Sequence, residues 1–366
     1  MELATAMNQR ARRKLWFGLL ALGLGLILAL VACELLLRNF DPLGRNYETE
    51  VATYRKEAVT YVWERRQVAP ADLTAADLDG RLYWHKPLLD LDLGSFDLHT
   101  NRLGFRGPEI TAQKPAGTFR ILVLGDSVAF GWGVNDQFTF LRRWEIELQQ
   151  RFACEVVNTG LPMYDSMQEA ALLRDDGIQL EPDLVLLLYV VNDIEPTRDV
   201  VEQAVLGGTP DPKEQLVAPP DAWSFTADHI DGLLPATATL LRLQSDPAVR
   251  ILRALPAGTN YVPELFGKGP RGWQRSREAL RTIRDLCEAR HIPLVLLDHS
   301  QPAIKALPDF CHTEGIPYHA FRFSPDELRL PIRNSPLDSH ANQRGHDLLL
   351  AKLRSLEAEL PLTTRK

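Results

Sequence analysis

The chain has 366 residues, of which 45% are hydrophobic and 24% are charged, so it carries enough apolar material for a sizeable core. This composition is typical of a globular protein and excludes a disordered or low-complexity chain. The formal net charge is −7, which makes nucleic acid an unexpected partner.

An apolar run near the N-terminus predicts a membrane-spanning helix. Residues 15–33 carry no charge and are about as long as the ~20 residues that a helix needs to cross the hydrocarbon core. The residues just before the run are basic: Arg10, Arg12, Arg13 and Lys14. The positive-inside rule therefore assigns residues 1–14 to the cytoplasm and the chain beyond the helix to the other side. We expect an uncleaved signal-anchor over residues 15–37, in contact with the lipid bilayer.

Two other interpretations of this segment stay open. Leu30-Val31-Ala32-Cys33 resembles a lipoprotein cleavage box, which would attach a lipid to Cys33. Complete removal as a secretory signal requires small residues before the cut, and no good Ala-x-Ala site is present. Both the anchor and the lipid would leave the remaining chain attached to the membrane.

Residues 38–117 follow the anchor and show no sustained hydrophobic period. They contain several aromatic residues and read as a stalk with a short lead-in that packs on the main domain. Their last part, residues 101–109, is rich in turn formers and predicts an ordered surface loop.

After residue 117, short apolar runs alternate with amphipathic segments. The predicted strands are 119–124, 154–158, 184–191, 294–298 and 318–321, and the predicted helices are 137–151, 166–179, 273–290, 304–314 and 342–359. Strands that alternate with helices indicate βαβ units, and therefore a parallel sheet with helices on both faces.

A long stretch, residues 195–272, interrupts this alternation and is rich in proline and glycine. It is too long for a plain connection, so we interpret it as a lid over the strand ends or as a decorative insertion. The four cysteines form no Cys-x-x-Cys pair and no zinc spacing, so no metal ion and no cofactor are expected. A Cys287–Cys311 disulfide stays open.

Residues that can carry chemistry lie after the predicted strands and before the last helix. Ser127 follows Gly125 and Asp126 at the end of the first strand, where ligand sites of open α/β sheets lie. A serine hydroxyl needs a positioned base to act as a nucleophile, and His340 is the candidate base. Asp338, two residues before it, is close enough to hold the imidazole in the useful tautomer.

Acyl transfer also needs hydrogen-bond donors for the developing oxyanion. Gly160 follows the second strand and offers an unobstructed N–H, and Asn192 follows the third and offers its side-chain amide. Each residue also has an ordinary structural interpretation: Ser127 as a helix cap, Gly160 and Asn192 as turn residues, and His340 as a surface histidine. The four together, in this order, favour the functional interpretation.

These blocks resemble the SGNH (GDSL) hydrolase family over about residues 118–356, and we place the hydrolase domain at 118–360. The resemblance rests on Gly125-Asp126-Ser127, Asn158-Thr159-Gly160, Val191-Asn192-Asp193 and Asp338-Ser339-His340-Ala341-Asn342 with Gly345-His346. It implies a flavodoxin-like three-layer α/β/α sandwich with a mostly parallel five-stranded sheet. It also implies a nucleophile at Ser127, an oxyanion hole at Gly160 and Asn192, and a base at His340. The common family pattern has the acid three residues before the histidine, where this chain has Leu337; Asp338, at two residues before His340, departs from that pattern.

The lead-in residues 101–109 and the anchor end Glu34-Leu35-Leu36-Leu37-Arg38 resemble membrane-anchored bacterial members of the family. This resemblance implies a serine esterase on the inner membrane, facing the periplasm. The expected substrate is a small ester, an O-acetyl group on an envelope or secreted glycan. Three alternatives stay open. The first is an acetyltransferase of an exopolysaccharide, which would need a membrane partner that donates acetyl groups. The others are a lipase or lysophospholipase, and a catalytically silent membrane-tethered binding module.

Overall fold

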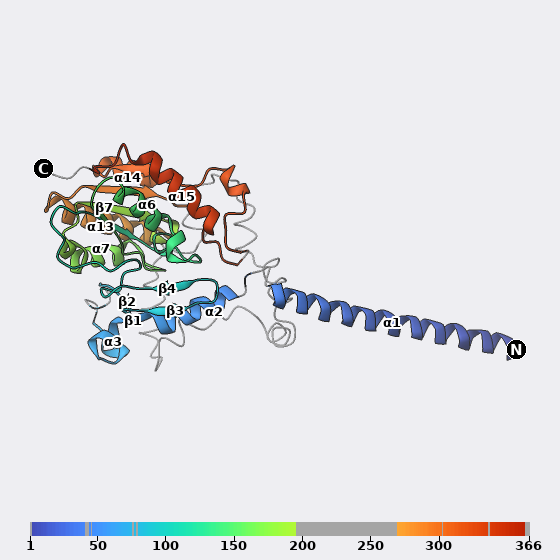
Figure 1. Ribbon diagram of the computed structural model, residues 1–366. Coiled ribbons are helices and arrows are strands. Elements are labelled where there is room, and N and C mark those ends of the chain that lie inside the picture. The colour runs from blue at the N-terminus through green and yellow to red at the C-terminus, as the bar shows by residue number, and fades with distance from the viewer. Residues whose placement is uncertain are drawn as a thin grey trace. The chain divides into compact units, whose positions relative to one another are not determined.

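A computed structural model describes residues 2–40, 44, 46–74, 77, 80–194, 269–301, 303–335 and 337–362 (Figure 1). Helix α1 (Glu2–Phe40) belongs to one compact unit, and nearly all described residues from Asn46 onward form another. Within α1, Ala11–Leu37 is long and apolar enough to cross a membrane, and a signal sequence near an N-terminus has the same properties. The predicted insertion at 195–272 lies outside the described residues except for its last four.

The second unit is built on a five-stranded sheet in which every neighbouring pair is parallel. Its strands are β5 (Phe119–Gly125), β6 (Cys154–Asn158), β7 (Leu184–Tyr189), β8 (Leu294–Asp298) and β9 (Tyr318–Ala320). The spatial order is β6-β5-β7-β8-β9, which is the 2-1-3-4-5 order of flavodoxin-like folds. This confirms the predicted fold class.

Helices cover both faces of the sheet because the strands are apolar on both. In β5, Leu122 and Leu124 point into one core, and Ile121 and Val123 point into the other. The first core receives α7 (Ser166–Asp175), α13 (Gly269–Glu288) and α14 (Ala306–Thr313), and the second receives α6 (Phe140–Gln149) and α15 (Gln343–Leu356). Full burial of such a side chain contributes about 1.5–3 kcal/mol, so the sheet is a rigid platform for its strand ends.

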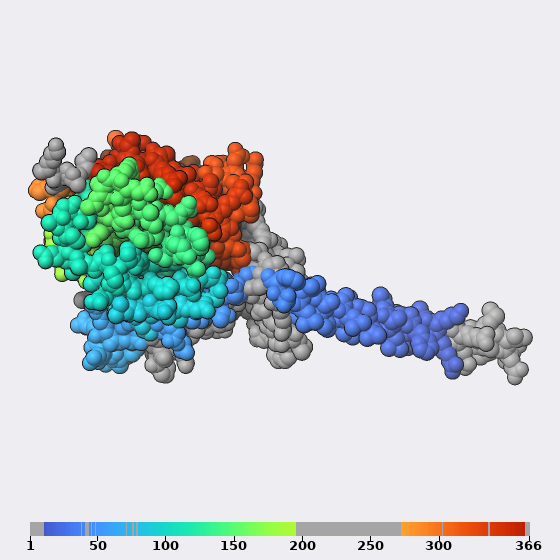
Figure 2. Space-filling view, viewed as in Figure 1, coloured from blue at the N-terminus to red at the C-terminus, as the bar shows by residue number. Residues whose placement is uncertain are grey.

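The lead-in segment (residues 46–117) is folded and packs on the first of these cores. Its elements are α2 (Asn46–Thr53), the π-helix η1 (Tyr54–Ala58), β1 (Val59–Tyr61), α3 (Val62–Arg66), η2 (Pro70–Asp72), β2 (Tyr83–His85), β3 (Asp90–Asp92) and β4 (Asp97–His99). Strands β1 and β2 pair antiparallel, as do β3 and β4. Buried Tyr54, Trp63 and Phe96 join the cluster that contains Leu122. In Figure 2 this blue-to-cyan segment lies directly against the green part of the chain.

Two details differ from the sequence-based expectations, and a third answers a question that the sequence left open. Residues 101–109 are not simply a surface loop, because Asn101, Phe105 and Arg106 are buried. Strand β7 ends at Tyr189 rather than at residue 191, because the carboxylate of Asp193 accepts the Val190 N–H and closes a 3₁₀ turn, η5 (Val191–Ile194). The four cysteines are free, so the Cys287–Cys311 disulfide is absent. The remaining short elements are α5 (Ser127–Phe130), η3 (Asp136–Phe138), η4 (Gly177–Leu180) and η7 (Glu327–Arg329).

Candidate active site

Ser127 begins helix α5, and one residue, Asp126, separates it from the end of strand β5. Asp126 caps this helix, and its Oδ1 accepts the Val128 N–H at 2.9 Å. Gly125 allows the tight turn, because a Cβ there would lie 2.6 Å from the Ala129 Cβ. The short helix therefore holds the Ser127 hydroxyl at the carboxyl end of the sheet.

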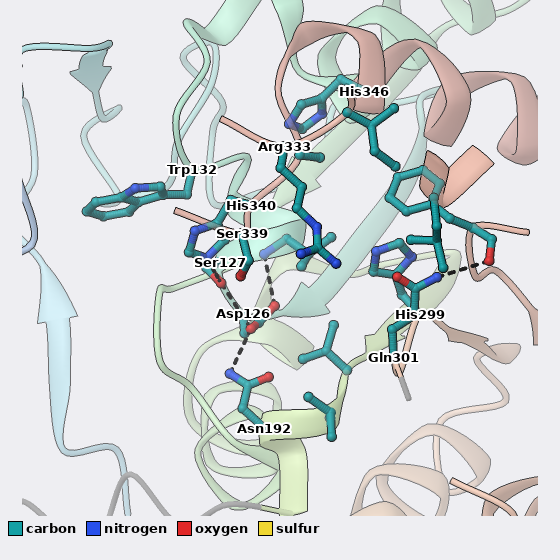
Figure 3. A pocket seen from close by; sticks show the side chains of 17 residues that line it. Asp126, Ser127, Trp132, Asn192, His299, Gln301, Arg333, Ser339, His340 and His346 are labelled. Carbon is teal, nitrogen blue, oxygen red and sulfur yellow. Dashed lines mark hydrogen bonds between the residues drawn. The ribbon is translucent and has the colours of Figure 1, made fainter. Parts of the chain in front are cut away.

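The structure brings His340 and Asp338 to Ser127 from the other end of the chain. Figure 3 shows His340 beside Ser127. His340 Nε2 lies 2.8 Å from Ser127 Oγ, and His340 Nδ1 lies 2.5 Å from Asp338 Oδ1. Asn334 donates to the other Asp338 oxygen at 2.8 Å, which fixes the carboxylate. The acid at minus two is thus within direct reach of the imidazole.

This geometry determines which nitrogen of His340 can act as a base. The Asp338 carboxylate only accepts hydrogen bonds, so it stabilises the tautomer with the proton on Nδ1. The Nε2 lone pair then faces the hydroxyl of Ser127. Ser127 Oγ also lies 3.1 Å from Asp126 Oδ2, so its single proton has two acceptors. Rotation of the hydroxyl toward His340 is required before Oγ can act as a nucleophile.

Asn192 lies on η5, directly after β7, the strand next to β5 on the side where the strand order reverses. Its Nδ2 donates to Asp126 Oδ2 at 2.8 Å, so the amide lies beside the Ser127 turn and lines the same pocket. An amide nitrogen carries two hydrogens, and this bond uses one of them. The Ser127 N–H lies in the first turn of α5, where a helix leaves its N–H groups without intrahelical partners.

Gly160 packs against the start of α5 and is not among the residues that line the pocket. Its N–H donates to Asn158 Oδ1 at 3.0 Å. A Cβ at this position would lie 2.5 Å from the Phe130 nitrogen and 2.9 Å from the Asp126 oxygen, so glycine is needed for the close packing of α5. The role of Gly160 as an oxyanion donor stays a prediction, and it would require this N–H to exchange its partner.

Ser127, Asn192 and His340 line a pocket of about 290 Å³. Its walls combine apolar residues with His299, Gln301, Arg333 and His346 (Figure 3). The Phe140 N–H donates to His346 Nδ1, which leaves the proton of this ring on Nε2. Burial lowers the pKa of His346 to about 3 and also lowers the pKa of His299, so both rings are neutral at neutral pH.

Two neighbouring buried acids, Asp193 and Glu169, lie at η5. Asp193 accepts the Val190 N–H at 2.7 Å and the Ser166 hydroxyl at 2.8 Å. Burial raises the pKa of both Asp193 and the neighbouring Glu169 well above the usual range. The charge of Asp193 adds to the rise at Glu169, and the charge of Asp126 adds to the rise at Asp193. These contacts fix the turn that carries Asn192.

Arg106 was missed by the sequence-based prediction although it supports helix α5, which begins at Ser127. Its guanidinium donates to the carbonyls of Phe130, Gly131 and Val134 at 3.0, 2.7 and 2.5 Å, where α5 ends. Burial lowers the pKa of this guanidinium to about 10. The turn-rich character of residues 101–109 was the only sign in the sequence that this loop is ordered.

Two aromatic rings flank the candidate base. The ring centroids of Tyr47 and Trp132 each lie 6.0 Å from that of His340, and these two rings meet edge to face at 6.1 Å. Burial, together with the negative charge of Asp338, raises the pKa of Tyr47 to about 12. Tyr47 belongs to the lead-in segment, which therefore contributes to the wall behind His340.

A parallel α/β sandwich with a serine, a histidine and a carboxylate in line at its strand ends is typical of serine hydrolases. The model of the GDSL-like Lipase/Acylhydrolase family matches residues 123–348, and the chain belongs to this family. It is therefore a hydrolase of the SGNH type, whose members are esterases and acylhydrolases. Among the described residues, no group of three or more His, Cys, Asp or Glu is placed to hold a metal ion.

Solved structures of several esterases are similar to the chain at low sequence identity. The psychrotrophic esterase EstA from Pseudoalteromonas sp. is 12% identical, with a TM-score of 0.35, over 66% of this chain and 97% of EstA. The acetyl xylan esterase AlAXEase is 12% identical, with a TM-score of 0.35, over 65% of this chain and all of that one. A two-domain esterase (CEX) active on acetylated mannans is 14% identical, with a TM-score of 0.36, over 68% of this chain and 50% of CEX. No curated protein matches the chain.

Proposed function

We propose that the protein is a serine esterase that removes small acyl groups, in particular O-acetyl groups, from envelope or secreted glycans. The observation that carries this proposal is the position of His340, which lies within hydrogen-bonding distance of both Ser127 Oγ and Asp338 Oδ1. Ser127 is the nucleophile, His340 the base and Asp338 the acid that orients it.

The first half-reaction forms an acyl-enzyme. Ser127 Oγ attacks the acyl carbon while His340 Nε2 takes the hydroxyl proton, and Asp338 stabilises the resulting imidazolium. The carbonyl oxygen becomes an oxyanion, which the Asn192 amide and the Ser127 N–H stabilise. The Gly160 N–H is a third donor when it leaves its bond to Asn158 Oδ1. In related enzymes, removal of one such donor raises the activation free energy by roughly 2.7–4 kcal/mol. The tetrahedral intermediate collapses, and His340 returns the proton to the leaving alcohol.

The second half-reaction releases the acid. Water attacks the acyl carbon of the ester on Ser127, and His340 Nε2 takes a proton from the water. A second tetrahedral intermediate collapses, the bond between Oγ and the acyl carbon breaks, and the proton returns to Oγ. The free carboxylic acid leaves, and Ser127 and His340 are restored.

Pocket size and the N-terminal helix support the finer parts of the proposal. A cavity of about 290 Å³ is at the lower end of the range for ligand pockets, which favours a small acyl group. Residues 15–37, which lie within the candidate span Ala11–Leu37, serve as an anchor in the inner membrane, with the hydrolase domain (118–360) and its insertion (195–272) on the periplasmic side.

The nucleophile is tested with the full-length protein in detergent and p-nitrophenyl acetate. Ser127→Ala is expected to lower the turnover to the background of the reaction without enzyme. Ser355→Ala, the same change on the exposed side of α15, is the control and should retain the wild-type rate. Unchanged turnover by Ser127→Ala, or labelling of that variant by a fluorophosphonate probe, would contradict the assignment.

The substrate class is tested by NMR of an acetylated glycan incubated with the protein. Free acetate, with loss of the O-acetyl signals, supports the esterase. Hydrolysis of lysophospholipids but not of acetylated glycans would favour a lipase instead. A gain of O-acetyl groups on a second glycan would favour transfer.

A further inference from the structure

An exposed arginine, Arg333, lines the pocket. No hydrogen bond or ion pair of its guanidinium is recorded among the described residues. Other described arginines near the pocket are engaged: Arg106 with the end of α5, and Arg143 with Asp347. In Figure 3 the Arg333 guanidinium lies over the pocket, between His340 on one side and His299 on the other.

The backbone of Arg333 is fixed relative to the base. Arg333 and Ala341 form an antiparallel bridge. The Asn334 N–H donates to the His340 carbonyl at 3.0 Å, and the Asn342 N–H donates to the Ile332 carbonyl at 2.9 Å. The Asn342 side chain donates to the Arg333 carbonyl, also at 2.9 Å. The segment that carries Arg333 is therefore joined to the segment that carries His340, and Arg333 stays on the base's side of the pocket.

No other lining group of the described pocket presents a full positive charge at neutral pH while His340 is the free base. His299 and His346 are neutral, because burial lowers the pKa of each. The Asp126 carboxylate is buried and accepts three hydrogen bonds, from Val128, Ser127 and Asn192. A positive pole on a protein of net charge −7 is suited to an anionic group, and a guanidinium binds carboxylate or phosphate through two parallel hydrogen bonds.

We propose that Arg333 selects esters whose alcohol part carries an anion, a carboxylate or a phosphate, as in an O-acetylated acidic sugar. This inference rests on the proposed function, because the roles of Ser127 and His340 define the two sides of the ester. His340 gives its proton to the leaving alcohol, so the alcohol part lies on the side of His340 and Arg333. The oxyanion and the acyl group lie toward Asn192, on η5.

The test compares three esters with the full-length protein in detergent: phenyl acetate, 4-acetoxybenzoate and 4-acetoxyphenyl phosphate. The first is neutral, and the others carry the anion on the leaving group. The readout is the ratio of kcat/KM for each anionic ester to kcat/KM for the neutral one. Arg333→Gln is expected to lower this ratio roughly tenfold or more, because a charge-assisted hydrogen bond is lost. Arg333→Lys keeps the positive charge but not the planar guanidinium with its paired donors, so the ratio should fall less than in Arg333→Gln.

Arg344→Gln is the matched control, because Arg344 is an exposed arginine on α15 outside the pocket lining. It removes the same charge and should leave the ratio within twofold of wild type. An unchanged ratio in Arg333→Gln, or an equal fall in both variants, would overturn the inference. A larger fall for one anionic ester identifies carboxylate or phosphate as the preferred group. Hydrolysis of all three esters by Ser127→Ala would instead refute the proposed nucleophile, so the two failures are distinguishable.

Discussion

The central sheet and the lead-in segment reach the same site by different means. The sheet consists of continuous apolar strands, and in β5 all seven residues are buried. The lead-in segment consists of three-residue strands and short helical turns that hold together through aromatic contacts and polar anchors such as Arg106. The sheet fixes where Ser127 and Asn192 lie, whereas the lead-in segment supports the back of α5 and of His340. A region without regular patterning can thus be as important to a site as the strands that carry its residues.

The largest expected effect is at Arg106, which joins the lead-in segment to the end of α5. We expect Arg106→Gln to lower the free energy of unfolding by roughly 3–5 kcal/mol, because three carbonyl groups lose a buried charged donor. Urea unfolding followed by circular dichroism measures this. Arg102→Gln is the control in the same loop, because its side chain is 79% exposed, and its effect should stay within about 0.5 kcal/mol. Equal stability of the two variants would contradict a structural role of the lead-in segment.

Gly160→Ala tests whether close packing at the end of strand β6 positions Ser127. The new Cβ would meet the backbone of Phe130 and Asp126, so α5 and the Ser127 hydroxyl must shift. A misplacement of about 1 Å can cost roughly 100-fold in rate, and we expect a loss of that order in kcat for p-nitrophenyl acetate. Gly80→Ala, which would meet nothing closer than 3.7 Å, should retain the wild-type rate. A Gly160→Ala enzyme with normal kcat would show that this packing does not position the nucleophile.

Two buried histidines, one in each region, test whether the regions unfold together. Burial lowers the pKa of His85 and of His346 to about 3 from the ordinary value of 6.5. The unfolded chain therefore binds protons below pH 6.5 that the folded protein does not bind, so stability falls as the pH falls from 6.5 toward 3. Each histidine should cost about 2 kcal/mol between pH 6.5 and pH 5.

Replacement of His85 or His346 should make the free energy of unfolding depend less on pH below 6.5. His346→Asn keeps an acceptor near the position of Nδ1 for the Phe140 N–H, and His85→Gln keeps a partner near Nε2 for the Tyr54 hydroxyl. The free energy of unfolding, measured at several pH values, should decline less steeply in both variants. If only His346→Asn changes the main transition, the lead-in segment unfolds separately from the sheet.

The smallest expected effect is at Tyr47. Loss of its ring in Tyr47→Ala removes one wall of His340 and should lower kcat about fivefold, equivalent to ~1 kcal/mol for an aromatic contact. Tyr47→Phe keeps the ring and should stay within twofold of wild type. Equal kcat values for the two variants would show that the ring does not hold the imidazole.

Much of the sheet could be predicted from the sequence because its pattern is local. Strands at 154–158 and 294–298 have the predicted bounds, since apolar runs between turn residues determine both ends. The end of β7 could not be predicted, because it depends on a hydrogen bond from Val190 to Asp193. The lead-in strands are three residues long, too short for any period, and their stability comes from contacts with distant residues.

Some residues of the candidate site could be predicted from the sequence, and others could not. Ser127, Asn192, His340 and Asp338 stand at strand ends or before the last helix, so their order along the chain indicates that they meet. Arg106, Tyr47 and Arg333 reach the site through tertiary packing, and nothing in their neighbouring residues specifies it. The direction of the Gly160 N–H is also a three-dimensional property, since residue spacing alone cannot indicate that Asn158 accepts it.

The antiparallel bridge between Arg106 and Asn158 has a practical consequence. Strand β6 is the outermost strand on its side of the sheet, with β5 as its only strand partner among the described strands. An uncovered edge strand is a template for pairing with other chains and for aggregation. A shortened protein that starts at residue 118 would lose the bridge and uncover buried apolar side chains such as Phe130. Expression of the hydrolase part should therefore begin at or before Asn46.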